Sequence, residues 1–205
     1  MTERPIIFSA AMVRALLAGR KTQTRRLATS PLRHVQTGDR LYVREAVSCG
    51  GVFSDVVELR YRAHERASHT EFVEQVPVSR AISALPAFPK YRPSIHMPRW
   101  ASRLTLAVIG VRQEPLQSME GQHPLESDAI AEGVNRIHHG DGDYYHSVFR
   151  DHPHPSNWSD PADAFRELWD SLHDKSGERW SDNPDVVALS FRVIRGNVDQ
   201  LECSP

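Results

Sequence analysis

The stretch LLAGRKTQTRR, Leu16–Arg26, is where a short apolar helix ends, and it decides how we interpret the rest of the chain. The helix that precedes it has Ser9 as an N-cap, apolar residues at helical spacing, and Gly19 as its stop. A strand is expected to follow. The pattern therefore predicts a β-α-β opening with a dense group of cations and hydroxyls between the helix and the second strand.

Lys21 is the residue of this stretch with the clearest chemical potential. It is one of three lysines in the chain, with Lys90 and Lys175, and its neighbours in the stretch are arginines. Arginine stays protonated in proteins, whereas a lysine that is buried among other cations has a lowered pKa. A neutral Lys21 can accept the proton of a hydroxyl such as that of Thr24. The alternative interpretation is a solvated basic turn.

Size and composition point to one domain with a hydrophobic core, or one domain with a large excursion. The chain has 205 residues, of which 40% are hydrophobic. It has no apolar run of membrane-spanning length and no signal-peptide pattern, so we expect no membrane partner and a cytoplasmic location. Cys49 and Cys203 match no metal or redox spacing. Two free thiols are expected, with one disulfide as the alternative.

The net charge of -1 conceals an asymmetry along the chain. Among the first 44 residues, bases greatly outnumber acids. Residues 90–112 hold five cations and no acid, and in residues 114–185 acids greatly outnumber bases. This distribution favours one face that binds a polyanion or a phosphate-bearing ligand. The alternative is that the two halves neutralise each other in the fold.

Hydrophobic patterning predicts an α+β fold. Apolar or alternating runs predict strands at Pro5–Phe8, Leu41–Val47, Val56–Ala63, Ser102–Arg112 and Val186–Ile194, with the second and third joined across Gly50-Gly51. Further helices are expected at Ser127–Gly133 and from Pro161, where Phe165, Leu168, Trp169 and Leu172 form an apolar stripe. Successive strands without alternating helices favour a small mixed or antiparallel barrel over a doubly wound sheet.

Two segments lack a period and are predicted to be loop insertions in a single domain that spans residues 1–195. The first, about 64–93, leads into Tyr91–Trp100 (YRPSIHMPRW), where aromatic rings and arginines favour base stacking and phosphate contact. The alternative is a loop held in the core by Trp100. The second insertion, about 135–160, is rich in histidine but has no zinc-motif spacing, so we expect a polar surface loop and no metal. Residues 196–205 are predicted to be a flexible tail.

The helix ending in Ala18–Arg25 (AGRKTQTR), together with Thr37–Leu41 (TGDRL), resembles the opening of the ASCH family. The closing strand Val187–Phe191, and the segments Tyr91–Leu106 and Asp128–Val134, resemble ASCH-containing proteins of bacteriophages and prophages. The resemblance covers most of the chain in patches. It implies a PUA-like β-barrel with flanking helices.

The resemblance also implies an activity. A small bacterial ASCH protein is an N4-acetylcytidine amidohydrolase that uses a lysine and a threonine of this motif and a glutamate from a later helix; these correspond to Lys21, Thr24 and Glu132. Thr24 would attack the acyl carbon, Lys21 would accept its proton, and Glu132 would orient the pair or protonate the leaving amine. An oxyanion or phosphate would be held by an arginine of the motif: Arg20, Arg25 or Arg26. No metal or cofactor is required.

Two other functions stay open. The protein can be a non-catalytic module for RNA or DNA, in which the basic residues contact phosphate and the aromatic segment binds bases. The residues expected to serve there are Tyr91, His96, Arg99, Trp100 and Arg103. It can also be a ribonuclease, with Lys21 and His96 as an acid–base pair. The expected partner is thus a modified nucleoside or a single-stranded nucleic acid, and polynucleotide binding would weaken steeply with salt.

Overall fold

A computed structural model describes residues 1–63, 74–121 and 127–201 and has an α+β fold. The chain forms two compact units, each built from separated parts of the sequence. Unit 1 comprises Met1–Leu17, Arg40–Ala107 and Val193–Pro205, and unit 2 comprises Ala18–Asp39 and Val108–Arg192. The long strands β7 and β10 contribute residues to both units. Each unit is described by itself.

The first sheet of unit 1 contains β1 (Glu3–Ile7), β3 (Arg40–Arg44) and the start of β7 (Leu104–Pro115). β3 lies between the other two, parallel to β1 and antiparallel to β7. Helix α1 (Ala10–Leu17) follows β1, and its Met12 N–H donates to the Ser9 hydroxyl at 3.4 Å. The predicted first strand and helix are confirmed, and Gly19 beyond the helix has a φ of 71°.

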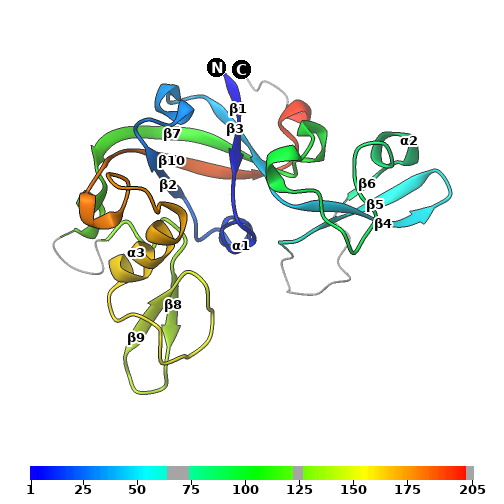
Figure 1. The fold of residues 1–205 in the computed structure, drawn as a ribbon. Helices are drawn as coiled ribbons and strands as arrows, with labels where there is room; N and C mark the ends of the chain where they lie inside the picture. Colours follow the sequence, from blue (N-terminus) through cyan, green and yellow to red (C-terminus); the bar gives the residue numbers. More distant parts are fainter. Residues whose placement is uncertain (64–73, 122–126, 202–205) are drawn as a thin grey trace. The chain divides into compact units, whose positions relative to one another are not determined.

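The second sheet of unit 1 is antiparallel, in the order β4-β5-β6. Its strands are β4 (Val47–Phe53), β5 (Val56–Tyr61) and β6 (Glu74–Pro77), followed by the short helix α2 (Val78–Ala81) (Figure 1). The prediction of one strand over Leu41–Val47 and a turn at Gly50-Gly51 is wrong. The glycines lie inside β4, at a shift of register with β5, and the turn falls at Ser54, with a φ of 55°.

The predicted irregular insertion at 64–93 is wrong for residues 74–81, which form β6 and α2. Residues 64–73 lie outside the described part of the chain. These residues form regular structure because the apolar side chains of this region complete a core cluster with β4 and β5. The cluster is formed by Val47, Cys49, Val57, Leu59, Tyr61, Val76, Ala81, Leu85, Met97 and Ala101. Trp100 packs against it, as the alternative interpretation of that residue expected.

Unit 2 contains β2 (Gln23–Leu27), the end of β7 and most of β10 (Asp185–Arg195), in the order β7-β10-β2. β2 and β10 are antiparallel. Helix α3 (Pro161–Leu172) begins where the Asp160 carboxylate accepts the Ala162 N–H at 2.7 Å. The strand predicted at Val186–Ile194 and the helix predicted from Pro161 are confirmed. Within the predicted apolar stripe Leu172 is the exception, because it lies at the last position of α3, is 65% exposed and is not buried with the others.

Two predictions within unit 2 need correction. The predicted loop at 135–160 contains an antiparallel hairpin of β8 (Asn135–His138) and β9 (Tyr144–Ser147) (Figure 1). Asp128–Gly133 forms consecutive turns in place of the predicted helix, because its backbone hydrogen bonds have mixed spacing: the Glu132 N–H donates to the Asp128 carbonyl, but the Gly133 N–H donates to Ile130 and the Val134 N–H to Ala129. The Ala131 carbonyl accepts N–H groups from Thr22 and Gln23, which ties these turns to the chain entering β2.

The predicted flexible tail is ordered over residues 196–201. The short helix η7 (Val198–Gln200) follows Asn197, whose amide donates to the carbonyls of Arg99 and Ser102 at 2.9 and 2.8 Å. Residues 202–205, including Cys203, lie outside the described part, so the expectation of two free thiols stays a prediction. Cys49 is buried. The other 3₁₀ helices are η1 (Pro31–His34), η2 (Ser94–His96), η3 (Arg99–Ala101), η4 (Leu116–Glu120) and η6 (Trp180–Asp182).

Within the described residues, the helices are all too short or too polar to cross a membrane.

Candidate functional site

A buried ion pair between Lys21 and Glu132 lies at the centre of the candidate site in unit 2. The Lys21 Nζ donates to the Glu132 Oε2 at 2.9 Å and to the Glu132 backbone carbonyl at 2.6 Å. Each side chain is only 2% exposed. The ASCH resemblance implies one site for these two residues, and they are in direct contact in the structure although 111 positions separate them.

Backbone hydrogen bonds fix the position of this pair. The N–H groups of Thr22 and Gln23 both donate to the Ala131 carbonyl, at 2.8 and 3.0 Å. The Thr22 carbonyl in turn accepts the Phe191 N–H of β10 at 2.9 Å. The turn that carries Glu132 is thereby held against the start of β2, directly beside Lys21. A buried charged pair needs such rigid backbone support, since a small displacement would leave both charges without a partner.

Arg25 joins the same carboxylates from within β2. Its guanidinium donates to Glu132 at 3.1 Å, to Glu114 at 2.6 Å and to Asp128 at 2.6 Å. The Arg25 side chain is completely buried. The attraction of these carboxylates outweighs burial and raises the pKa of Arg25. A guanidinium already surrounded by three carboxylates is poorly suited to bind an oxyanion or phosphate, which argues against that predicted role for Arg25.

Thr24 is fully buried, and its hydroxyl is bound by the neighbouring motif arginine. The Arg26 Nη1 donates to the Thr24 Oγ1 at 2.9 Å and to the Arg25 carbonyl at the same distance. A cation that donates to this oxygen stabilises negative charge that develops on it, as when the hydroxyl loses its proton. Of the motif arginines, Arg26 is therefore the one best placed to assist Thr24.

The electrostatic environment makes Lys21 easier to deprotonate. Burial lowers the pKa of Lys21, the attraction of Glu132 opposes this effect, and the nearby guanidiniums of Arg26 and Arg25 lower the pKa further. Burial likewise lowers the pKa of Arg26. Of these cations, only lysine has an ordinary pKa close enough to neutrality for such a shift to matter chemically. The arrangement can therefore supply a proton acceptor at Lys21.

The outer members of this cluster, Asp128 and Glu114, were not predicted from the sequence. Asp128 accepts hydrogen bonds from Gln23 at 3.1 Å and from Arg112 at 2.8 Å, and Glu114 accepts one from Arg112 at 3.1 Å. Burial raises the pKa of Asp128, but its contacts with Arg25, Gln23 and Arg112 outweigh burial and lower it overall. One signal was available in the sequence: Asp128 stands four residues before Glu132, the spacing that would put both side chains on one face of the helix predicted there.

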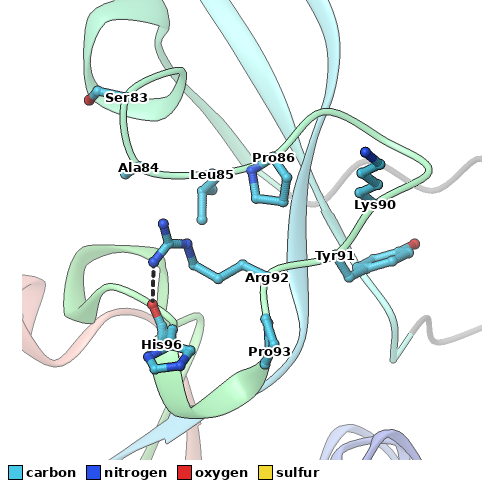
Figure 2. Close-up of a pocket in the computed structure, with 9 residues that line it drawn as sticks. All are labelled: Ser83, Ala84, Leu85, Pro86, Lys90, Tyr91, Arg92, Pro93 and His96. Atoms are coloured by element: carbon cyan, nitrogen blue, oxygen red, sulfur yellow. Dashed lines mark hydrogen bonds between the residues drawn. The ribbon is translucent and has the colours of Figure 1, made fainter.

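Among the predicted binding residues, Arg20 lies in unit 2 and is exposed, with its guanidinium 3.3 Å from the Gly133 carbonyl. The other predicted binding residues fall in unit 1. Tyr91 and His96 line a pocket on the surface of that unit (Figure 2). The ribonuclease alternative pairs Lys21 with His96, which belong to different units, and it stays a prediction.

Three predicted binding residues of unit 1 are engaged within the protein. Arg103 is 4% exposed and forms a bidentate pair with Glu45 at 2.8 and 3.1 Å. Arg99 is paired with Glu3 and Asp199. Trp100 packs on the core cluster, with the Arg80 guanidinium 5.0 Å from its ring centre. These contacts argue against the predicted roles of Arg99, Trp100 and Arg103 in nucleic-acid binding.

Within the described residues, no group of three or more His, Cys, Asp or Glu side chains is arranged to hold a metal ion. In the hairpin region, His139 contacts Asn157 at 3.0 Å and His146 contacts the Ser159 carbonyl at 3.1 Å. These histidines are therefore engaged in local hydrogen bonds.

No family model, curated protein or solved structure matches this chain. The resemblance to the ASCH family therefore rests on the quoted motifs alone.

Proposed function

We propose that this protein hydrolyses the acyl amide of an N4-acylated cytidine-type nucleoside, with Lys21, Thr24 and Glu132 as its working residues. The observation that supports this most directly is the buried contact of Lys21 with Glu132 at 2.9 Å. It unites the lysine of the motif with the distant glutamate that the ASCH resemblance selects. The proposal includes membership of the ASCH family, a PUA-like barrel and a cytoplasmic location.

In the proposed reaction, Thr24 is the nucleophile. Its oxygen forms a bond to the acyl carbon while its proton passes to the neutral amine of Lys21. Glu132 accepts a hydrogen bond from Lys21 and thereby stabilises the ammonium ion that forms. Arg26 stabilises the charge that develops on the threonine oxygen, to which it already donates.

The second half of the reaction restores the site. The ammonium of Lys21 gives its proton to the cytosine N4 as the carbon–nitrogen bond breaks, and cytidine leaves. A water molecule then adds to the acyl-threonine ester with Lys21 again accepting a proton, and the carboxylic acid departs as the threonine hydroxyl reforms. The sequence consumes one amide and one water and needs no redox partner.

The decisive experiment measures release of cytidine from N4-acetylcytidine by the wild type and by two variants, Lys21→Met and Thr24→Val. Both substitutions keep the approximate volume of the side chain and remove the reacting group. We expect turnover by the wild type and a loss of at least about 10³-fold in kcat for each variant. Thr24→Ser keeps a hydroxyl and is expected to retain measurable turnover.

Thr22→Val is the matched control, because Thr22 belongs to the same motif but its side chain is exposed. This variant should turn over like the wild type, and circular dichroism of every variant checks that it is folded. Absence of turnover in a folded wild type, or full activity in Thr24→Val, would sink the proposal.

A further inference from the structure

The Glu132 carboxylate is divided between two cations. Its Oε2 accepts a hydrogen bond from the Lys21 Nζ at 2.9 Å, and its Oε1 accepts one from the Arg25 Nη1 at 3.1 Å. Each cation holds one oxygen, so the carboxylate is fixed on both sides. Because the two cations share one negative charge, they compete for it. The proposed reaction uses the contact with Lys21 and gives no role to Arg25.

Two further carboxylates compete with Glu132 for Arg25. The Arg25 Nη2 donates to Glu114 and to Asp128, each at 2.6 Å. Both contacts are shorter than the 3.1 Å contact with Glu132, and charge-assisted hydrogen bonds are the short, strong ones. The Arg25 side chain is completely buried, whereas Glu114 is 18% and Asp128 34% exposed. The two outer carboxylates therefore neutralise most of the charge of Arg25, and Glu132 has the weaker hold on it.

The charged side chains at and around the Lys21–Glu132 pair come from segments of unit 2 that surround it. Within the described residues they are Arg20 with the nearby Asp151, Arg25, Arg26, Glu132, Asp128, Glu114 and Arg112. The residues of β10 that pair with Thr24–Arg26 are apolar and add no charge. Burial is the main cause that lowers the pKa of Lys21, Glu132 opposes it, and Arg26 and Arg25 lower the pKa further.

We propose that Arg25 is a positioning residue of this site, which holds Glu132 and limits how strongly that carboxylate retains the proton on Lys21. The two outer carboxylates set the size of this effect, because their charge neutralises part of the charge of Arg25. Arg25 acts through Glu132 and touches no reacting atom. The inference rests on the proposed function, in which Lys21 must lose a proton, but the charge coupling it describes can be measured without turnover.

The two ends of this network should act on Lys21 with opposite signs. Arg25→Gln removes a cation and leaves Glu132 to Lys21 alone, so Lys21 should lose its proton at higher pH. Asp128→Asn or Glu114→Gln removes negative charge from Arg25, which then holds Glu132 more strongly, so Lys21 should lose its proton at lower pH. A merely structural role has a different outcome, because a loosened site admits water, relieves burial and moves the titration of Lys21 to higher pH in every variant.

The small number of lysines allows a direct measurement. The chain contains three, Lys21, Lys90 and Lys175. NMR of protein labelled with ¹³C at the lysine Cε should give one signal for each, and the signal that is absent from Lys21→Met is that of Lys21. A pH titration then locates the midpoint for Lys21 in each variant. Lys90 and Lys175 are exposed and serve as internal references, whose titrations should be the same in every variant.

Asp128→Asn is the principal variant, because a partly exposed carboxylate can be replaced without burying an unpaired charge. Asp163→Asn is the matched control, since Asp163 is 38% exposed and also pairs with an arginine, Arg166, at 3.0 Å. We expect Asp128→Asn and Glu114→Gln to move the Lys21 titration and the inflection of kcat to lower pH. On the rising limb of the pH–rate profile, kcat should then increase about twofold or more. The control should behave like the wild type.

The proposal is overturned if the Lys21 titration moves to higher pH in Asp128→Asn and Glu114→Gln, or stays at the wild-type position in both. These two variants decide the result by themselves if Arg25→Gln does not fold. Shifts of the predicted sign in a protein that does not turn over N4-acetylcytidine would support the coupling through Arg25 and sink the hydrolase proposal alone. Turnover with an unmoved Lys21 titration would do the reverse.

Discussion

Each unit of the molecule contains a carboxylate that is buried against a cation, and the two pairs differ in whether that cation can lose its proton. In unit 2, Lys21 meets Glu132 at 2.9 Å, and both are 2% exposed. In unit 1, Arg103 meets Glu45 through two hydrogen bonds, at 2.8 and 3.1 Å, with 4% and 2% exposure. Distance and burial are nearly equal, so the difference lies in the cation.

The cation of the arginine pair stays charged. Arg103 also donates to the Ala63 carbonyl and lies 4.2 Å from the centre of the Tyr61 ring, so its guanidinium is held on several sides. Burial raises the pKa of Glu45, and Arg103 opposes that change. A guanidinium does not release its proton at any ordinary pH. Arg103 can therefore fix the chain but cannot supply a neutral base that accepts a proton.

The lysine pair can change its state of protonation. Burial lowers the pKa of Lys21, and two neighbouring guanidiniums act in the same direction. Two equally buried pairs thus differ in whether the cation can release its proton, because of one side-chain type. Five predictions test this distinction.

The largest expected effect is on stability and comes from removing either carboxylate. Glu132→Gln leaves Lys21 and Arg25 short of an acceptor, and Glu45→Gln does the same to Arg103. Each change should lower the free energy of unfolding by about 3–5 kcal/mol, the usual cost of a buried charge that loses its partner. Urea denaturation measures it. Glu120→Gln, at an exposed position, should change stability by less than about 0.5 kcal/mol. Equal stability of all three variants would contradict the comparison.

Exchanging the two cations should affect activity at one site and stability at the other. Lys21→Arg keeps a positive charge but removes the proton acceptor, so kcat for N4-acetylcytidine should fall about 10³-fold or more. Arg103→Lys loses the bidentate geometry and should cost about 1–3 kcal/mol of stability with kcat unchanged. Steady-state kinetics and urea denaturation of the two variants provide the measurements. An active Lys21→Arg enzyme would rule out Lys21 as the base.

We expect kcat to change with pH as the protonation state of Lys21 changes. The reaction needs the neutral amine, so kcat should rise with pH and level off, with an inflection below the ordinary pKa of lysine because burial lowers the pKa of this group. A pH–rate profile over the range in which the protein stays folded makes the measurement. A rate that falls as pH rises would be incompatible with Lys21 as the proton acceptor.

The pH dependence of the free energy of unfolding should report on Lys21 independently of activity. With the pKa of Lys21 lowered in the folded protein, the unfolded chain binds more protons between the folded and unfolded pKa values, so wild-type stability should rise with pH across that window. Lys21→Met should lack this rise.

The smallest effect is expected at the exposed edge of the unit 2 cluster. Arg112 pairs with Glu114 at 3.1 Å and with Asp128 at 2.8 Å, but its side chain is 50% exposed. Arg112→Gln should therefore cost no more than about 1 kcal/mol in urea denaturation, since water and salt screen exposed pairs. A loss as large as that of Glu132→Gln would show that burial is not what distinguishes the strong pairs.

Local sequence signals predicted the elements whose patterns are complete within a few residues. The cap and stop of α1, the alternating β5, the apolar β7 and the Asp160-Pro161 start of α3 all required only neighbouring residues. The failures have a different origin. Ser127–Gly133 has a helical cap and stop, yet it forms turns that are tied to the start of β2 through the bonds from Thr22 and Gln23 to Ala131. Asn197 is ordered by carbonyls almost a hundred positions away.

The sequence by itself determined which residues carry titratable or hydroxyl groups in unusual company: a lone lysine among arginines, two threonines beside it, and a short cationic segment at Lys90–Arg92. Only the tertiary structure decided which cations meet carboxylates. Lys21, Arg25 and Arg103 are buried and paired, whereas Lys90 and Arg92 line a pocket whose described residues include no acid. The physical reason is that a charge is given its function by its surroundings. Desolvation and partner placement depend on residues distant in sequence, and no local pattern records them.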